Sequence, residues 1–98
     1  MYKTVLARQA VKDVDKLRQA GLLDNAKELT RIVQNNPYQH PPPYEKLTGN
    51  LDGYYSRRIN RQHRFVYEVL PNENDELDET GMPYQGIVRI LRMWSHYD

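Results

Sequence analysis

A cluster of arginines and aromatic residues between residues 54 and 69 carries the strongest chemical signal in the sequence. Two runs rich in aromatic and β-branched residues, Tyr54–Ile59 and Arg64–Val69, flank the polar residues 60–63, which is the pattern of a β-hairpin. Guanidinium groups present fixed forks of donors to phosphate oxygens, and aromatic faces stack on unpaired bases. The hairpin is therefore either a surface that binds phosphate and RNA or a solvated, salt-bridged sheet edge. Its members are Arg57, Arg58, Arg61 and Arg64, interleaved with Tyr54, Tyr55, Phe65 and Tyr67.

The residues needed to cut RNA without a metal ion are all present. Such a reaction requires a base for the 2′-hydroxyl, an acid for the departing 5′-oxygen, and a cation that holds the charge of the phosphorane. The sequence offers Glu45 in a loop, Arg64 at the start of a strand, and His96 and Tyr97 after the last strand. Each residue alone has an ordinary structural explanation. Only their combination with the arginine hairpin points to ribonuclease chemistry.

The composition argues against other chemistries. The 98 residues include no cysteine, so a thiol nucleophile and a cysteine-ligated metal are excluded. His40, His63 and His96 lack the spacing of paired ligands, so we expect no metal and no cofactor. There is no Gly-rich phosphate loop and no nucleophile elbow. We find neither an apolar run of ~20 residues nor a signal peptide, so we expect a cytoplasmic protein without a membrane partner.

The net charge of +1 hides a strong segregation of charge. Residues 68–79 hold six acidic residues and no Lys or Arg, whereas the other 86 residues carry 14 basic and seven acidic ones. A basic body favours an anionic partner. The acidic, turn-rich stretch 71–86 is predicted to be a long, mobile excursion between strands.

The hydrophobic periodicity predicts one α+β domain spanning residues 1–98, with the element order β-α-α-β-β-β. We expect a small antiparallel β-sheet with two N-terminal helices packed on one side. The predicted elements are a strand at Tyr2–Leu6, a helix from Ala7 that stops at Gly21, a helix from Leu22 to Asn36, a loop over residues 37–53, the hairpin, and a buried strand at Ile87–Trp94.

Three details concern single side chains. The consecutive prolines Pro41–Pro43 are expected to stiffen the loop that holds Glu45 beside the sheet. In the first helix, Asp13 lies off the apolar stripe. In the last strand, Arg89 and Arg92 have opposite parity, so they point to opposite faces if the strand is regular.

The segment Glu45–Val69 and the closing His96–Tyr97 resemble the Txe/YoeB toxins of the RelE/ParE superfamily. The signs are an acid shortly before Asn-Leu-x-Gly, then Ser-Arg-Arg-Ile, then His-Arg-x-Val-Tyr, and a terminal His-Tyr. The order of the predicted elements agrees with the RelE-like microbial ribonuclease fold over nearly the whole chain.

This resemblance implies the toxin of a bacterial type II toxin–antitoxin system. Such a toxin is an mRNA interferase, an endoribonuclease that cuts mRNA in the ribosomal 30S A site by metal-independent attack of the 2′-hydroxyl and so inhibits translation. Its partners would be a Phd/YefM-type antitoxin, mRNA and the ribosome, and the chain could form a homodimer. The alternative is a ParE-like toxin, which shares the fold but binds DNA gyrase and has no need of a base and an acid flanking an arginine.

The resemblance also implies roles for individual residues. Glu45 would be the general base, His96 the general acid, Arg64 the group that stabilises the phosphorane, and Tyr97 a residue that positions or stacks the substrate. The family has a lysine three residues after the acid, where this chain has Thr48, so Lys46 would substitute for it. The expected RNA-binding residues are Lys46, Tyr55, Arg57, Arg58 and Arg61.

Overall fold

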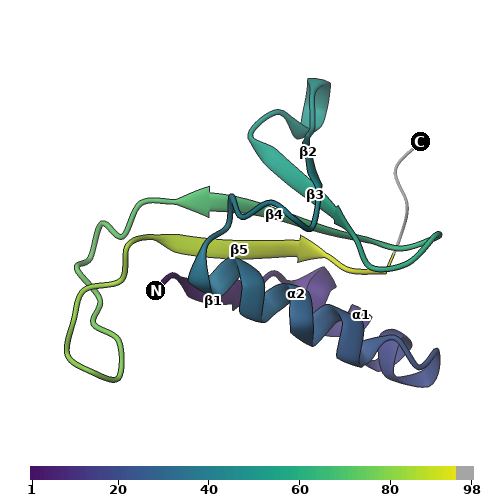
Figure 1. Cartoon of the computed structure of the whole chain (residues 1–98), viewed down its shortest axis with the longest axis horizontal. Helices are drawn as coiled ribbons and strands as arrows, with labels where there is room; N and C mark the ends of the chain where they lie inside the picture. Colours follow the sequence, from purple (N-terminus) through teal and green to yellow (C-terminus); the bar gives the residue numbers. More distant parts are fainter. Residues whose placement is uncertain (95–98) are drawn as a thin grey trace.

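The structure is a computed structural model that describes residues 1–94, in which two helices cover one face of a five-stranded sheet (Figure 1). The strand order is β1-β5-β4-β3-β2. The other face of the sheet, which we call the open face, is covered by neither α1 nor α2. The elements are β1 (Lys3–Leu6), α1 (Arg8–Gln19), α2 (Leu23–Asn35), β2 (Tyr44–Lys46), a short 3₁₀ turn (Gly49–Leu51), β3 (Tyr54–Arg58), β4 (Arg64–Leu70) and β5 (Ile87–Arg92).

The α+β class, the two helices on one side and the hairpin are confirmed, and the description of the sheet needs one correction. β1 pairs with β5 in parallel, whereas the other three strand pairs are antiparallel, so the sheet is mixed. About 80 residues separate the end of β1 from the start of β5, so no tight turn forces these two strands to run in opposite directions. A further short strand, β2, forms inside the stretch expected to be only a loop, and it becomes the edge of the sheet beside β3.

The core lies between the helices and the sheet. Gly21 has φ of 72°, which lets the chain turn between α1 and α2 as the sequence indicates. Neither helix of the described chain is long and apolar enough to cross a membrane. The core joins Ala10, Leu17, Ala26, Leu29 and Val33 of the helices to Phe65, Tyr67, Val88 and Ile90 of the sheet.

Asp13, expected on the polar side of α1, is fully buried. Its carboxylate accepts hydrogen bonds from the backbone N–H groups of Met93 at 2.8 Å and Trp94 at 3.2 Å, and from the side chain of Gln9 at 3.0 Å. A buried carboxylate is tolerated when donors surround it in this way. Asp13 therefore fixes the backbone at Met93 and Trp94, directly after β5. In the sequence, His96 follows Trp94 by two residues.

Arg89 and Arg92 both face the open side, because β5 is not the regular strand for which opposite faces were expected. The pairing of β4 with β5 shifts between Val66 and Tyr67, which places Arg92 opposite Val66 and Arg89 opposite Glu68. Directly opposite residues of an antiparallel pair share a face. The strand is therefore not regular, because a β-bulge inserts one residue and inverts the parity after it.

The acidic excursion over residues 71–86 folds back on itself. The side chain of Asn72 donates hydrogen bonds to the carbonyl groups of Glu76 and Tyr84, and Lys3 of β1 forms an ion pair with Glu76 at 2.7 Å. The excursion lies at the end of the sheet opposite the turn between β3 and β4 (Figure 1). Its negative charge is thus kept away from the arginines of the hairpin.

Candidate active site

Glu45 and Arg64 meet on the open face of the sheet. The strand register places Glu45 of β2 opposite Ser56 of β3, and Ser56 opposite Val66 of β4. Arg64 Nε donates a hydrogen bond to Ser56 Oγ at 2.7 Å, and Arg64 Nη2 lies 3.3 Å from Glu45 Oε1. The Arg64 side chain is 18% exposed and that of Glu45 is 69% exposed. Ser56 thus fixes the guanidinium of Arg64, while the carboxylate of Glu45 stays accessible to a ligand.

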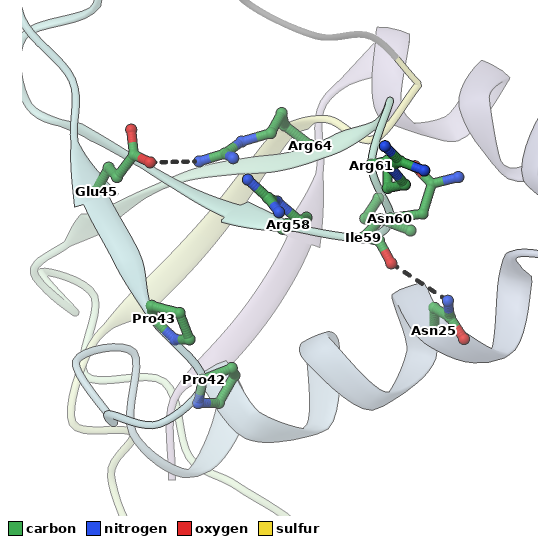
Figure 2. Close-up of a pocket in the computed structure, with 9 residues that line it drawn as sticks. All are labelled: Asn25, Pro42, Pro43, Glu45, Arg58, Ile59, Asn60, Arg61 and Arg64. Atoms are coloured by element: carbon green, nitrogen blue, oxygen red, sulfur yellow. Dashed lines mark hydrogen bonds and ion pairs between the residues drawn. The ribbon is translucent and has the colours of Figure 1, made fainter.

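A surface pocket of about 640 Å³ adjoins this pair, where β2, the proline loop, the turn after β3 and the start of α2 come together (Figure 2). Asn25 of α2 holds the turn by donating a hydrogen bond from Nδ2 to the carbonyl of Ile59 at 3.2 Å. Arg58 and Arg61 are exposed and form no ion pair within residues 1–94. The lining residues are Asn25, Pro42, Pro43, Glu45, Arg58, Ile59, Asn60, Arg61 and Arg64.

This arrangement suits an anionic ligand. Three guanidinium groups border the pocket, and within residues 1–94 only that of Arg64 is paired with a carboxylate. Guanidinium groups bind phosphate oxygens through paired hydrogen bonds, and a carboxylate beside them can accept a proton from a substrate hydroxyl. Among residues 1–94, no group of His, Asp and Glu is placed to hold a metal ion.

Arg57, expected to bind RNA, is instead fully buried beneath the proline loop. Its guanidinium carbon lies 4.9 Å from the centre of the Tyr44 ring. A side chain with no exposed surface cannot reach RNA in this structure, so the expected role is corrected: Arg57 fastens the loop that leads into Glu45. Its hydrogen bonds, 2.6 to 3.0 Å long, go to Tyr67 Oη and to the carbonyl oxygens of Pro37, Gln39 and Pro42.

Tyr55 and Lys46 do not join the pocket either. They pair with each other across β2 and β3 and so lie on the opposite side of these strands from Glu45. The half-buried ring of Tyr55 contacts the rings of Tyr38, Tyr44 and Tyr67, at centroid distances of 5.6 to 5.7 Å. One face of the ring stacks on Tyr67, and the ring lies outside the pocket, so stacking of Tyr55 on a base stays a prediction. Lys46 is exposed but points away from the pocket.

The stability of the fold is expected to depend on pH through the buried hydroxyl of Tyr67, which accepts a hydrogen bond from Arg57. Burial raises the pKa of Tyr67 to about 12, and the nearby charge of Arg57 opposes this rise. An unfolded tyrosine loses its proton near pH 10, so above that pH ionisation lowers the free energy of the unfolded state before it affects the folded state. We therefore expect stability to fall between about pH 10 and pH 12.

Urea unfolding measured across this pH range tests the expectation. Tyr67→Phe removes the ionising group, so its urea midpoint should fall less steeply than that of the native chain. Equal slopes for the two proteins would show that Tyr67 does not ionise in this range.

His96 and Tyr97, the expected acid and substrate-positioning residue, lie outside the described residues. The structure adds two groups that the sequence reasoning missed. Ser56 supports Arg64, and the hairpin register could have revealed it, because Ser56 lies on the same side of β3 as Arg58. Asn25 reaches the pocket from 34 residues before Ile59, and no local sequence pattern signals such a contact.

Comparison with known sequences identifies a family. The family model described as "YoeB-like toxin of bacterial type II toxin-antitoxin system" matches residues 8–84. The chain is similar to Toxin YoeB of Synechocystis sp., with 40% identity over 52 residues, covering 53% of this chain and 60% of that toxin. It is also similar to Toxin RelK of Mycobacterium tuberculosis, with 39% identity over 51 residues, covering 49% of this chain and 60% of that toxin. The matches thus span about three fifths of the related toxins.

Comparison with solved structures extends over almost the whole chain. A YoeB/ParE toxin from Agrobacterium tumefaciens superimposes with a TM-score of 0.75 at 25% identity, covering 97% of this chain and 99% of the other. A YoeB dimer from Staphylococcus aureus gives 0.71 at 28% identity, with 98% of each chain covered. The heterotetrameric YoeB-YefM complex from the same organism gives 0.69 at 28% identity, with 99% of each chain covered.

Proposed function

The chain belongs to the YoeB-like toxins of bacterial type II toxin–antitoxin systems, and we propose that it is a ribosome-dependent endoribonuclease that cuts mRNA in the A site and inhibits translation. The observation that carries this proposal is the Glu45–Arg64 pair beside a pocket with two further arginines that have no ion pair in the described chain. In this proposal residues 1–98 form one toxin domain and act in the cytoplasm, where ribosomes are found.

Glu45 and Arg64 would act on the two groups that the new bond joins, the 2′-hydroxyl and the phosphate. Glu45 accepts the proton of the 2′-hydroxyl, whose oxygen then attacks the neighbouring phosphorus. Arg64 stabilises the charge that builds up on the phosphorane oxygens. The hydrogen bond from Arg64 to Ser56 keeps the guanidinium in place during this step. As the phosphate enters, it competes with Glu45 for Arg64 and so releases the carboxylate to act as a base.

The residues that act on the leaving 5′-oxygen and position the substrate are assigned from the resemblance in sequence. His96 would donate a proton to the 5′-oxygen as its bond to phosphorus breaks, and Tyr97 would position or stack the substrate. Asp13 supports this assignment, because it fixes the backbone at Met93 and Trp94 just before these residues. Arg58 and Arg61 would hold the phosphates that flank the cleaved one.

The proposed protein partner is a Phd/YefM-type antitoxin. The similar toxin from Staphylococcus aureus was solved in a YoeB-YefM complex and as a dimer, which supports an antitoxin partner and a homodimer for this chain. An acidic antitoxin segment over Arg58, Arg61 and Arg64 would block access of RNA to the pocket.

Product analysis tests the proposed chemistry. Because the 2′-hydroxyl is the nucleophile, the 5′ fragment should end in a 2′,3′-cyclic phosphate or a 3′-phosphate, and the 3′ fragment should start with a 5′-hydroxyl. EDTA added to the toxin before it meets intact ribosomes should leave the rate unchanged, and an mRNA with a 2′-deoxy residue at the cut should resist cleavage.

Two results would overturn this mechanism. One is cleavage of the 2′-deoxy mRNA at the rate of the all-ribose mRNA. The other is loss of activity when the toxin alone is treated with EDTA, with recovery when Mg²⁺ or Zn²⁺ is returned to it.

A further inference from the structure

Arg92 lies on the same cross-strand row as the proposed base. The register joins Glu45 to Ser56, Ser56 to Val66, and Val66 to Arg92, so these four side chains cross the open face from β2 to β5. The next residue, Met93, belongs to the core on the helix side. The β-bulge therefore has a specific result: it turns the last arginine of β5 away from the core and toward the face that carries Arg64.

Within residues 1–94, no carboxylate neutralises the charge of Arg92. Among residues 1–94, the buried Nε atom of Arg92 has no hydrogen-bond partner and the side chain forms no ion pair. Its neighbour on the same face, Arg89, is paired with Glu68 at 3.0 Å. A buried donor without an acceptor costs free energy, and native proteins retain few of them. Nε itself is covered, but the residue as a whole is only partly buried, so a ligand can reach the part of the Arg92 side chain that stays exposed.

The position of Arg92 relative to Arg64 suggests which ligand. Arg64 precedes Val66 by two residues, so it is the diagonal neighbour of Arg92 on the adjacent strand, roughly 7–8 Å away between backbones. This separation is comparable to that between neighbouring phosphates of a single RNA strand. We propose that Arg92 binds an RNA backbone phosphate next to the one held by Arg64, and so extends the binding face beyond the pocket. This inference rests on the proposed function.

Salt-dependent binding tests the proposal without relying on cleavage. The probe is a short, fluorescently labelled single-stranded oligonucleotide with 2′-O-methyl riboses, which cannot be cut by 2′-hydroxyl attack. Each phosphate contact to a single strand contributes about 0.7 to the slope of log K against log salt. Arg92→Gln should lower this slope by about 0.7, and Arg92→Lys should keep most of it. Arg58→Gln is the positive control, and Arg31→Gln, on the exposed side of α2, is the control expected to change nothing.

The thermal midpoints of the same proteins test whether Arg92 has a structural role instead. Because Arg92 has no partner in the described chain, Arg92→Gln and Arg92→Met should melt at the temperature of the native protein or above it. A lower midpoint for both variants, or an unchanged salt slope for Arg92→Gln while Arg58→Gln lowers it, would overturn the proposal. If Glu45→Gln still cleaves mRNA while Arg92→Gln lowers the slope, the cleavage mechanism fails and the role of Arg92 stands.

Discussion

Replacing Glu45 by glutamine is expected to lower the rate of ribosome-dependent mRNA cleavage by roughly 10²–10⁴-fold, which is the usual contribution of a general base. Glutamine keeps the size of the side chain but cannot take the proton of the 2′-hydroxyl. The loss should appear in single-turnover rates at saturating ribosome concentration. RNA binding should not weaken, because the substitution removes a negative charge beside Arg64.

Glu68 offers a matched control on the same face. It also forms an ion pair with an arginine, Arg89, but it does not line the pocket. Both ion pairs lie at the surface with each partner only partly covered, and ion pairs at the surface contribute about 0–1 kcal/mol to stability, so neither substitution should unfold the protein. Glu68→Gln should keep nearly full activity. If the two variants lose activity equally, Glu45 acts only through the surface charge and the general base lies elsewhere.

Replacing Arg57 by methionine is expected to lower the free energy of unfolding by about 3–5 kcal/mol, a loss comparable to that of removing one member of a buried ionic interaction. The change removes the donors that satisfy the carbonyl groups of Pro37, Gln39 and Pro42. The loop before β2 then loses its attachment to the sheet. Cleavage should fall as well, because Glu45 is no longer held beside Arg64.

The adjacent residue provides the control for this second prediction. Arg58 is exposed and has no ion pair in the described residues, so Arg58→Met should change the free energy of unfolding by less than about 0.5 kcal/mol. It should instead weaken the binding of RNA. Urea unfolding of both variants separates the two roles. Equal urea midpoints for Arg57→Met and Arg58→Met would contradict the structural role of Arg57.

These neighbouring arginines show how far the sequence could lead. The hairpin, the helices and the α+β class follow from local periodicity and turn residues, which act over a few positions. The type and spacing of Glu45 and Arg64 identified a pair that the structure brings within 3.3 Å. The sequence also marked Arg57 and Arg58 as equivalent, although the pleat of β3 sends one into the interior and the other to the surface.

The features that the sequence could not predict depend on distant contacts. Asp13 is buried where its carboxylate accepts hydrogen bonds from two backbone N–H groups, 80 and 81 residues later in the chain. Arg92 reaches the open face because a bulge opposite Val66 inverts the parity of β5. The parallel pairing of β1 with β5 is likewise set by packing of the whole domain rather than by any turn. Hydrophobic patterns carry no information on such partners.

The central claim, that this toxin cuts mRNA on the ribosome, is tested most directly by primer extension on a translated mRNA with and without ribosomes. The account predicts cleavage within codons that requires ribosomes and disappears in Glu45→Gln. No cleavage in either arm, together with growth arrest when the chain is expressed in bacteria, would contradict it and favour a toxin that binds DNA gyrase.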